Sequence, residues 1–276
     1  MARIFTTVAA AVALIACAEA VAPVPKGAWP ASKGTVTHKG AITVKKGEVF
    51  DGKMQTYERS DVRCNGQKES NQDTAMFLVE AGGTLKNVII GKNQMEGVHC
   101  DQHDCTIENV WWTDVCEDAL SVKGGTAKSV TRVIGGGARY AEDKVVQHNG
   151  LGTVKIEGFY AEDFGKLYRS CGNGGCGSKQ RHVELTNIYA VNPKKSIVTV
   201  NKNNGDTAKL KSIYIKQASG SKAKVCVWSK AVVKGEPVTL GDGPSAPLCQ
   251  YATSDIHYSA PARLLRDTAT DNETQA

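Results

Sequence analysis

The feature that most constrains the fold of this chain is a degenerate repeat of short strand-like runs. Residues 84–89 and 106–111 align at a shift of 22 residues, with Thr, an apolar residue, a charged residue, Asn and Val in the same order. Similar runs follow at 130–133, 154–159, 183–188 and 210–214, in steps of roughly 22 to 29 residues. The runs alternate apolar and polar residues, as half-buried strands do, and no helical periodicity of useful length competes with them.

A period of this length predicts an all-β, single-domain, right-handed parallel β-helix, also called a β-solenoid. In-register stacking would bury one residue of each coil in an apolar row, which we expect to contain Leu85, Ile107, Val154 and Leu185. The recurrent Asn at positions 87, 109 and 187 is predicted to cap turns with its side-chain amide. A β-sandwich is the alternative, but hairpin signals are sparse and the period is too long for a meander.

The first residues have the layout of a secretory signal peptide. Arg3 precedes an apolar stretch at 4–17, and Ala18, Glu19 and Ala20 supply the small-residue cleavage site, with Ala22 as the alternative. The stretch is shorter than the ~20 residues of a membrane-spanning helix, so we expect a secreted, extracellular protein. The predicted organisation is a leader at 1–20, a β-helix domain at 21–262 and a polar, disordered tail at 263–276.

Cysteine usage agrees with export. Loss of the leader would remove Cys17 and leave an even set in an oxidising compartment: Cys64, Cys100, Cys105, Cys116, Cys171, Cys176, Cys226 and Cys249. We expect four disulfides, and proximity in sequence favours the pairs Cys171/Cys176 and Cys226/Cys249. A zinc site is the alternative, but it would need short paired spacings with convergent His, and the pairs Cys100/Cys105 and Cys171/Cys176 lie in different repeats.

The formal net charge of +6 survives loss of the leader, because Arg3 and Glu19 cancel. Such an excess favours anionic partners. Nucleic acid is one candidate, yet the basic residues are scattered and no nucleic-acid motif is present. An acidic polysaccharide fits an exported protein better, and we expect a monomer.

Equal offsets in neighbouring coils place side chains on one face of a solenoid. Glu117 and Asp118 lie eight and nine residues after the Asn of their coil. Lys166 and Arg169 lie eight and eleven residues after the Gly at the matching place in a later coil. With Glu96 one coil earlier, the acids offer oxygens that suit a hard cation such as Ca²⁺. A solvated acidic turn is the alternative.

Four segments carry a resemblance to a known family: 96–100 (EGVHC), 111–120 (WWTDVCEDAL), 143–147 (DKVVQ) and 165–169 (GKLYR). In content and order they closely resemble the small class III pectate lyases, over roughly residues 34–200. The part after Cys249 carries no recognisable motif. The resemblance implies a parallel β-helix, bound Ca²⁺ and eliminative cleavage of polygalacturonate, an acidic polysaccharide of the plant cell wall.

The resemblance also implies roles for individual residues. The calcium ligands it implies are Glu96, Glu117 and Asp118, and the catalytic and substrate-binding cations are Lys144, Lys166 and Arg169. Lys123 falls where the family has a lysine near the site and is expected to bind substrate. Glu96 departs from members with Asp there, so its longer side chain predicts a shifted calcium position or an indirect contact.

Elimination requires a base that removes the C5 proton of galacturonate. The negative charge that forms at C5 spreads into the C6 carboxylate, so positive charge beside that carboxylate is also required. Arginine, with a pKa above about 12, is a poor base, whereas burial or neighbouring cations readily lower the pKa of lysine. We therefore expect Lys144 to be the base, with Lys166 and Arg169 binding uronate carboxylates. Arg169 as the base is the alternative.

Two other functional classes fit parts of the sequence. An inverting glycoside hydrolase would use paired acids from the set Asp101, Asp104, Asp114 and Asp118, but it leaves the spaced cations unexplained. A non-catalytic polysaccharide-binding solenoid would keep the basic face, yet the complete set of cations argues against it. No Ser or Cys nucleophile stands at a recognised spacing from a histidine, so we expect turn or stacking roles for His99, His103, His148 and His182.

Overall fold

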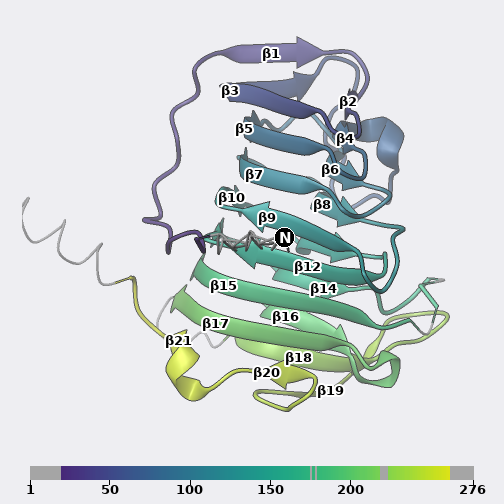
Figure 1. Ribbon diagram of the computed structural model, residues 1–276, viewed down its shortest axis with the longest axis vertical. Helices are drawn as coiled ribbons and strands as arrows, with labels where there is room; N and C mark the ends of the chain where they lie inside the picture. Colours follow the sequence, from purple (N-terminus) through teal and green to yellow (C-terminus); the bar gives the residue numbers. More distant parts are fainter. Residues whose placement is uncertain (1–19, 175, 178, 218–222, 262–276) are drawn as a thin grey trace, which may run out of the picture.

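The computed structural model describes residues 20–174, 176, 177, 179–217 and 223–261. The predicted leader, apart from Ala20, and the predicted tail lie outside the described residues. The described chain winds into a parallel β-helix whose coils stack along the long axis of the molecule (Figure 1). The predicted fold class is therefore confirmed.

Two sheets form the walls of the solenoid. The first has twelve strands: β1 (Thr35–His38), β3 (Val49–Arg59), β5 (Thr84–Ile90), β7 (Thr106–Trp112), β9 (Val130–Ile134), β10 (Gly137–Arg139), β12 (Gly152–Glu157), β13 (Tyr160–Glu162), β15 (Arg181–Val191), β17 (Thr207–Lys216), β20 (Cys249–Gln250) and β21 (Ile256–His257). The second has nine strands: β2 (Ile42–Val44), β4 (Ala75–Val79), β6 (Glu96–Cys100), β8 (Asp118–Val122), β11 (Lys144–His148), β14 (Lys166–Ser170), β16 (Ser196–Asn201), β18 (Lys224–Lys230) and β19 (Val238–Asp242). Short 3₁₀ turns lie at η1 (Gln72–Thr74), η2 (Lys202–Asn204) and η3 (Thr253–Asp255). The strand-like runs of the sequence repeat are β5, β7, β9, β12, β15 and β17, all in the first sheet.

The core is built from rows of apolar side chains that stack from coil to coil. Strand pairing places six buried residues in one row: Leu85, Ile107, Val133, Ile156, Leu185 and Leu210. The predicted row was wrong at one position, because Val154 stacks on Val183 in a neighbouring row. Val154 and Ile156 are two residues apart and both point inward, so alternation alone does not decide which of them continues the row.

The recurrent asparagines have the structural role that was predicted. Asn87, Asn109 and Asn187 adopt left-handed backbone conformations, with φ of 53°, 52° and 57°. The amide of Asn109 donates to Asn87 Oδ1 at 2.9 Å, and Asn187 donates to the Ala22 carbonyl at 2.7 Å. Asparagine tolerates this conformation better than most residues, so these positions bend the chain within each coil, inside β5, β7 and β15.

Four disulfides pair the eight cysteines. They are Cys64–Cys116, Cys100–Cys105, Cys171–Cys176 and Cys226–Cys249. Both pairs favoured by proximity in sequence are confirmed, and no cysteine of the described chain is left to hold zinc.

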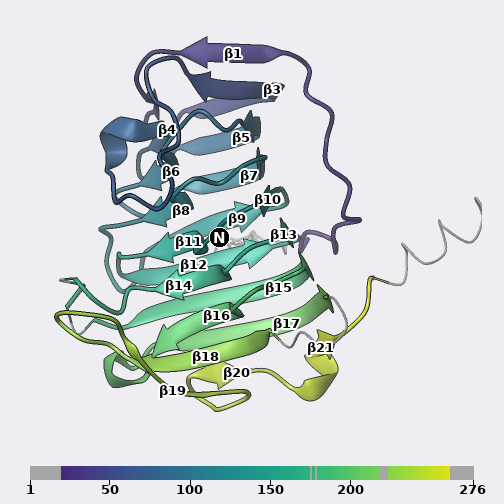
Figure 2. The ribbon, with the colours of Figure 1, turned by 180° about the vertical axis from the view of Figure 1, so that it is seen from behind.

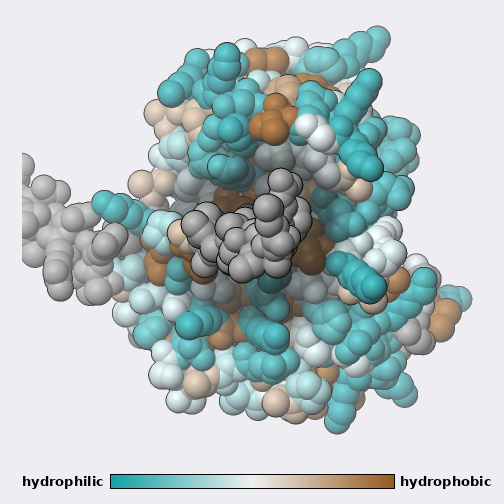
Figure 3. Space-filling model, in the orientation of Figure 1, coloured by the Kyte–Doolittle hydropathy of each residue, from teal (hydrophilic) through white to brown (hydrophobic). Residues whose placement is uncertain are grey.

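Hydrophilic residues cover much of the face seen in the space-filling view, with pale and hydrophobic residues among them (Figure 3). Among the described residues no helix has the length and apolar character needed to cross a membrane.

Candidate active site

Four neighbouring strands of the nine-stranded sheet, β6, β8, β11 and β14, carry the predicted site (Figure 2). Pairing puts Glu96 beside Asp118, Asp118 beside Lys144, and Lys144 beside Lys166. These side chains form one row across four coils. Adjacent strands are about 4.8 Å apart, so the row passes from carboxylates to ammonium groups within about 14 Å.

Glu96, Glu117 and Asp118 form the acidic end of the row and are 4%, 4% and 3% exposed. Each offers a carboxylate oxygen, and these oxygens all lie within 4.8 Å of one another. Ca²⁺ binds oxygen at about 2.4 Å, so two ligands of the same ion are at most about 4.8 Å apart. The spacing therefore fits one calcium ion, and the longer side chain of Glu96 still reaches the cluster.

The charges in this cluster are incompletely compensated. Asp118 Oδ1 is buried without a hydrogen-bond partner among the described residues, and Lys144 Nζ lies 3.3 Å from it. Burial raises the pKa of Asp118 well above its usual value; Lys144 opposes this, and the charges of Glu117 and Glu96 raise the pKa further. A buried oxygen among like charges gains most from a hard cation. The residues present thus fit Ca²⁺.

Lys144 joins the acidic cluster to the rest of the row. Its Nζ donates to Glu117 Oε1 at 3.0 Å and to Asp143 Oδ2 at 3.2 Å. Burial lowers the pKa of Lys144, but the charges of Asp118, Glu117 and Asp143 outweigh burial, so the pKa is raised. This direction is opposite to the lowering on which the prediction of Lys144 as the base relied. These carboxylates therefore favour the protonated form of Lys144.

Asp143 is a site residue to which the sequence reasoning gave no role. Its Oδ1 accepts hydrogen bonds from Lys166 and Lys195, and its Oδ2 accepts from Lys144. Burial raises the pKa of Asp143, but the hydrogen bond from Lys166 and the charges of Lys144 and Lys166 bring it below its usual value. For Lys166 the balance is the reverse, since burial lowers its pKa more than Asp143 raises it. The one signal in the sequence was the position of Asp143 directly before Lys144.

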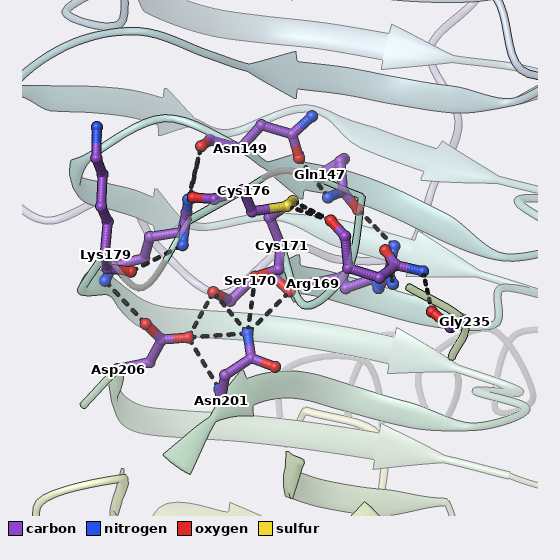
Figure 4. The surroundings of a disulfide bond; sticks show 12 residues. Gln147, Asn149, Arg169, Ser170, Cys171, Cys176, Lys179, Asn201, Asp206 and Gly235 are labelled. Atoms are coloured by element: carbon purple, nitrogen blue, oxygen red, sulfur yellow. Dashed lines mark hydrogen bonds between the residues drawn. A yellow bond between two sulfur atoms is a disulfide. The ribbon is translucent and has the colours of Figure 1, made fainter. Parts of the chain in front are cut away.

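Arg169 lies two coils beyond Ser121, beside Gln147 of the intervening coil. Its Nη1 donates to Gln147 Oε1 at 3.4 Å (Figure 4). Its Nη2 donates to Asn173 Oδ1 at 3.1 Å. Gln147 stood in the sequence motif without an assigned role, and nothing in the sequence singled out Asn173. The structure thus brings Arg169 to the predicted face and holds it through neutral amides.

Lys123 directly follows β8, at the carboxyl end of that strand. Within the described residues its ammonium forms no hydrogen bond or ion pair, although its charge acts on His99 and Asp101. Lys123 lines a hollow of 310 Å³ together with Glu96 and Asp118. A second hollow of 660 Å³ contains Lys166. The two hollows share Glu117, Lys144 and Arg169, so one groove connects all the predicted site residues.

One histidine belongs to this site. His99 Nε2 lies 3.3 Å from Glu96 Oε2, and its Nδ1 lies 3.0 Å from Asp101 Oδ1. Burial lowers the pKa of His99, but the bonds to Asp101 and Glu96 outweigh it and the pKa is raised. The expected stacking role is wrong for His99. It is confirmed for His103 and His148, whose rings meet edge to face at 5.3 Å.

The acids considered for a hydrolase do not gather around one point. Asp104 accepts from the Ser129 hydroxyl and from the Val130 amide, both at 2.7 Å, and so closes a turn. Asp114 is exposed on the turn after β7, and Asp101 is bonded to His99. Asp118 is the one member of that set in the buried cluster.

The comparison with known proteins decides the family. The pectate lyase family model matches residues 26–236. The chain belongs to the pectate lyase family. It is 50% identical over 225 residues to probable pectate lyase D of Neosartorya fischeri, covering 81% of this chain and 89% of that protein. Probable pectate lyase D of Emericella nidulans is 49% identical, with 80% of this chain and 81% of the relative covered.

Solved pectate lyases share the fold as well. The catalytic domain of pectate lyase PelI from Erwinia chrysanthemi is 30% identical with a TM-score of 0.65, covering 82% of this chain and 97% of that domain. PelI in complex with tetragalacturonic acid gives a TM-score of 0.64 at 30% identity, covering 82% of this chain and 69% of PelI. The chain is thus a polysaccharide lyase, and the hydrolase and non-catalytic alternatives are set aside.

Proposed function

We propose that the chain is a secreted lyase that cleaves α-1,4-linked polygalacturonate by calcium-dependent β-elimination and releases unsaturated oligogalacturonides. The observation that carries this proposal is the buried cluster of Glu96, Glu117 and Asp118 in the same groove as a row of cations. A galacturonate substrate is supported by the tetragalacturonic acid bound to the similar PelI structure.

The reaction needs a base, a positive environment and an oriented sugar. The base takes the C5 proton, the electrons of the C5–H bond form a C4=C5 double bond, and the C4–O bond breaks, after which the leaving oxygen is protonated. Glu96, Glu117 and Asp118 would hold Ca²⁺, which binds and polarises a uronate carboxylate. The negative charge that develops beside C5 spreads into that carboxylate, where fixed cations stabilise it.

Four cations of the groove take roles in this proposal. Arg169 presents a planar guanidinium whose fork can bind a carboxylate through two parallel hydrogen bonds. Lys166, three residues before Arg169 on β14, binds a carboxylate as a point charge. Lys123 has no ion-pair partner in the described chain and is available for a carboxylate at the other end of the groove. Lys144 lies between them, against the acidic cluster.

Lys144 is the proposed base, and Arg169 is the alternative. Burial lowers the pKa of Lys144, but the charges of Asp118, Glu117 and Asp143 outweigh it and favour the protonated form. Removal of the C5 proton requires the neutral amine, and Ca²⁺ held by Glu117 and Asp118 would compensate two of those three carboxylates.

The test is an ultraviolet assay for unsaturated products from polygalacturonate, with added Ca²⁺ and after exhaustive chelation. We expect activity with Ca²⁺, its loss on chelation and its return when Ca²⁺ is restored. Mass spectrometry should find a C4=C5 double bond at the new non-reducing end. Undiminished activity after chelation would refute the role of calcium, and saturated products would refute elimination.

Secretion, processing and oligomeric state belong to the same proposal. We infer cleavage after Ala20, leaving a mature domain at 21–262 with its tail at 263–276. The four disulfides support export, because an oxidising compartment is where such bonds persist. Amino-terminal sequencing of the secreted protein should begin at Val21, and size-exclusion chromatography with light scattering should give a monomer.

A further inference from the structure

The surroundings of Arg169 differ from those of the lysines in the groove. Lys144 and Lys166 each contact a carboxylate, whereas the guanidinium of Arg169 is bonded to the neutral amides of Gln147 and Asn173. In the described part of the chain, no carboxylate lies within ion-pairing distance of Arg169. Neutral partners fix the orientation of a guanidinium and leave its positive charge uncompensated.

Asn173 is itself held firmly in place. Its Nδ2 donates to the Gly235 carbonyl at 3.2 Å, and its carbonyl oxygen contacts both sulfurs of the Cys171–Cys176 disulfide. Next to it, the Gly172 carbonyl accepts from the Val232 amide at 2.8 Å. The turn after β14 is thus tied covalently by the disulfide and joined to the β18–β19 connection.

The other partner of Arg169 is anchored to the same structure. Gln147 Nε2 donates to the Asn149 side chain, and the Asn149 carbonyl accepts from Arg181 Nη2 at 2.9 Å. Arg181 is 1% exposed, and its Nη2 also donates to the Cys176 carbonyl at 2.8 Å. A network of neutral acceptors therefore runs from the buried Arg181 to the guanidinium in the groove.

We propose that Asn173 is a positioning residue that orients the Arg169 guanidinium toward a uronate carboxylate of the substrate without neutralising its charge. This inference rests on the proposed function, in which Arg169 binds that carboxylate. Asn173 also lines the groove, so it could contact the substrate directly. The test must distinguish such a contact from orientation of Arg169.

Two substitutions distinguish orientation from charge. Asn173→Ala removes the acceptor and leaves the Arg169 side chain free to choose among rotamers. Asn173→Asp keeps an acceptor oxygen at the same place and adds a negative charge beside the guanidinium. We expect Asn173→Ala to raise KM for polygalacturonate by on the order of tenfold, with kcat within about twofold, because the contact is made in both ground and transition states. Asn173→Asp should raise KM at least as much, because the added carboxylate compensates the charge of the guanidinium.

Asn203→Ala is the matched control. Asn203 anchors the start of the same β18–β19 connection, since it accepts from the Ala231 amide at 2.7 Å and donates to the Ala231 carbonyl at 3.1 Å. It has no contact with Arg169 among the described residues. If KM depends only on the anchoring of the β18–β19 connection, Asn203→Ala should raise KM as Asn173→Ala does. We expect Asn203→Ala to keep the parental KM.

The deciding measurement is a double-mutant cycle with Arg169→Ala in the full-length, calcium-loaded protein. We expect Asn173→Ala to change KM by less than about twofold once Arg169 is gone. An equal rise in both backgrounds would overturn the inference, because Asn173 would then act independently of Arg169. If KM rises in Arg169→Ala but stays at the parental value in Asn173→Ala, the inference is wrong and the proposed function is unaffected. A parental KM in Arg169→Ala would instead refute the proposed role of Arg169, and the inference with it.

Discussion

Replacement of Asp118 by Asn should raise the stability of the protein when calcium is absent and lower it when calcium is present. Asp118 lies within 4.8 Å of the oxygens offered by Glu96 and Glu117, and 3.3 Å from Lys144 Nζ. With an effective dielectric constant of about 20, each repulsion costs about 3.5 kcal/mol and the attraction contributes about 5 kcal/mol. The net repulsion is therefore about 2 kcal/mol. Without a cation, Asp118→Asn should relieve it and raise the melting temperature by roughly 4–8 °C.

With calcium the order should reverse. An ion present at about 1,000 times its dissociation constant stabilises the parent by about 4.1 kcal/mol, and the variant, which lacks one carboxylate ligand, should lose most of that gain. The assay is differential scanning calorimetry of both proteins at pH 8 in chelator and in excess CaCl₂. Asp114→Asn, which removes an exposed acid outside the cluster, is the control and should respond to calcium like the parent. The reasoning is refuted if the parent does not respond to calcium, or if Asp118→Asn melts below the parent in chelator.

Three further predictions concern other parts of the molecule. Lys144→Ala should lower kcat by orders of magnitude with little change in KM, and a small added amine should partly restore turnover; amine rescue of Arg169→Ala instead would make Arg169 the base. Ile156→Ala, in the central row, should lower the free energy of unfolding by about 2–5 kcal/mol in denaturant titrations; a loss below about 1 kcal/mol would contradict the packed row. Burial lowers the pKa of His148 well below its usual value, with further lowering by His103, so it folds neutral. Below about pH 6.5 the unfolded chain binds a proton at His148 that the folded chain does not bind. The contribution of neutral His148 to the free energy of unfolding should therefore be complete above about pH 6.5 and decrease by up to about 1.4 kcal/mol per pH unit below it. If His148→Gln has the same dependence of unfolding free energy on pH, this prediction is wrong.

The fold could be predicted because each coil of a solenoid repeats the same pattern of apolar and polar residues, so the sequence shows the period of the coils. Thr84 and Thr106 begin runs that pair residue for residue, and the 22-residue shift between them is the pairing register of β5 with β7. The second sheet was less visible, since its strands β6, β8 and β11 are buried at every position and show no alternation. The row through Val133 and Ile156 was misjudged for a related reason, because side chains two residues apart share one face.

The site residues were found through motifs and equal offsets, and those offsets fix only the face on which a side chain lies. Contacts formed between turns were beyond such reasoning. Asn173 reaches Arg169 from the turn after β14, and Gly235 meets Asn173 across 62 positions of sequence. The direction of the pKa shift of Lys144 was missed because it is set by how closely Asp118, Glu117 and Asp143 approach its ammonium and outweigh burial, and equal offsets do not give those distances.

Because each coil supplies one residue of the row, the distances between these residues along the stack are multiples of the strand spacing. Glu96, Asp118, Lys144 and Lys166 follow one another on consecutive strands, so the gap between any two of them can change only by whole strand spacings of about 4.8 Å. A coil gained or lost before β6 or after β14 leaves every spacing in the row intact. A coil inserted between β8 and β11 would separate the carboxylates from Lys144 by a full strand and break their contact. Changes in the length of this solenoid are therefore compatible with its chemistry at the two ends of the stack and incompatible with it in the middle.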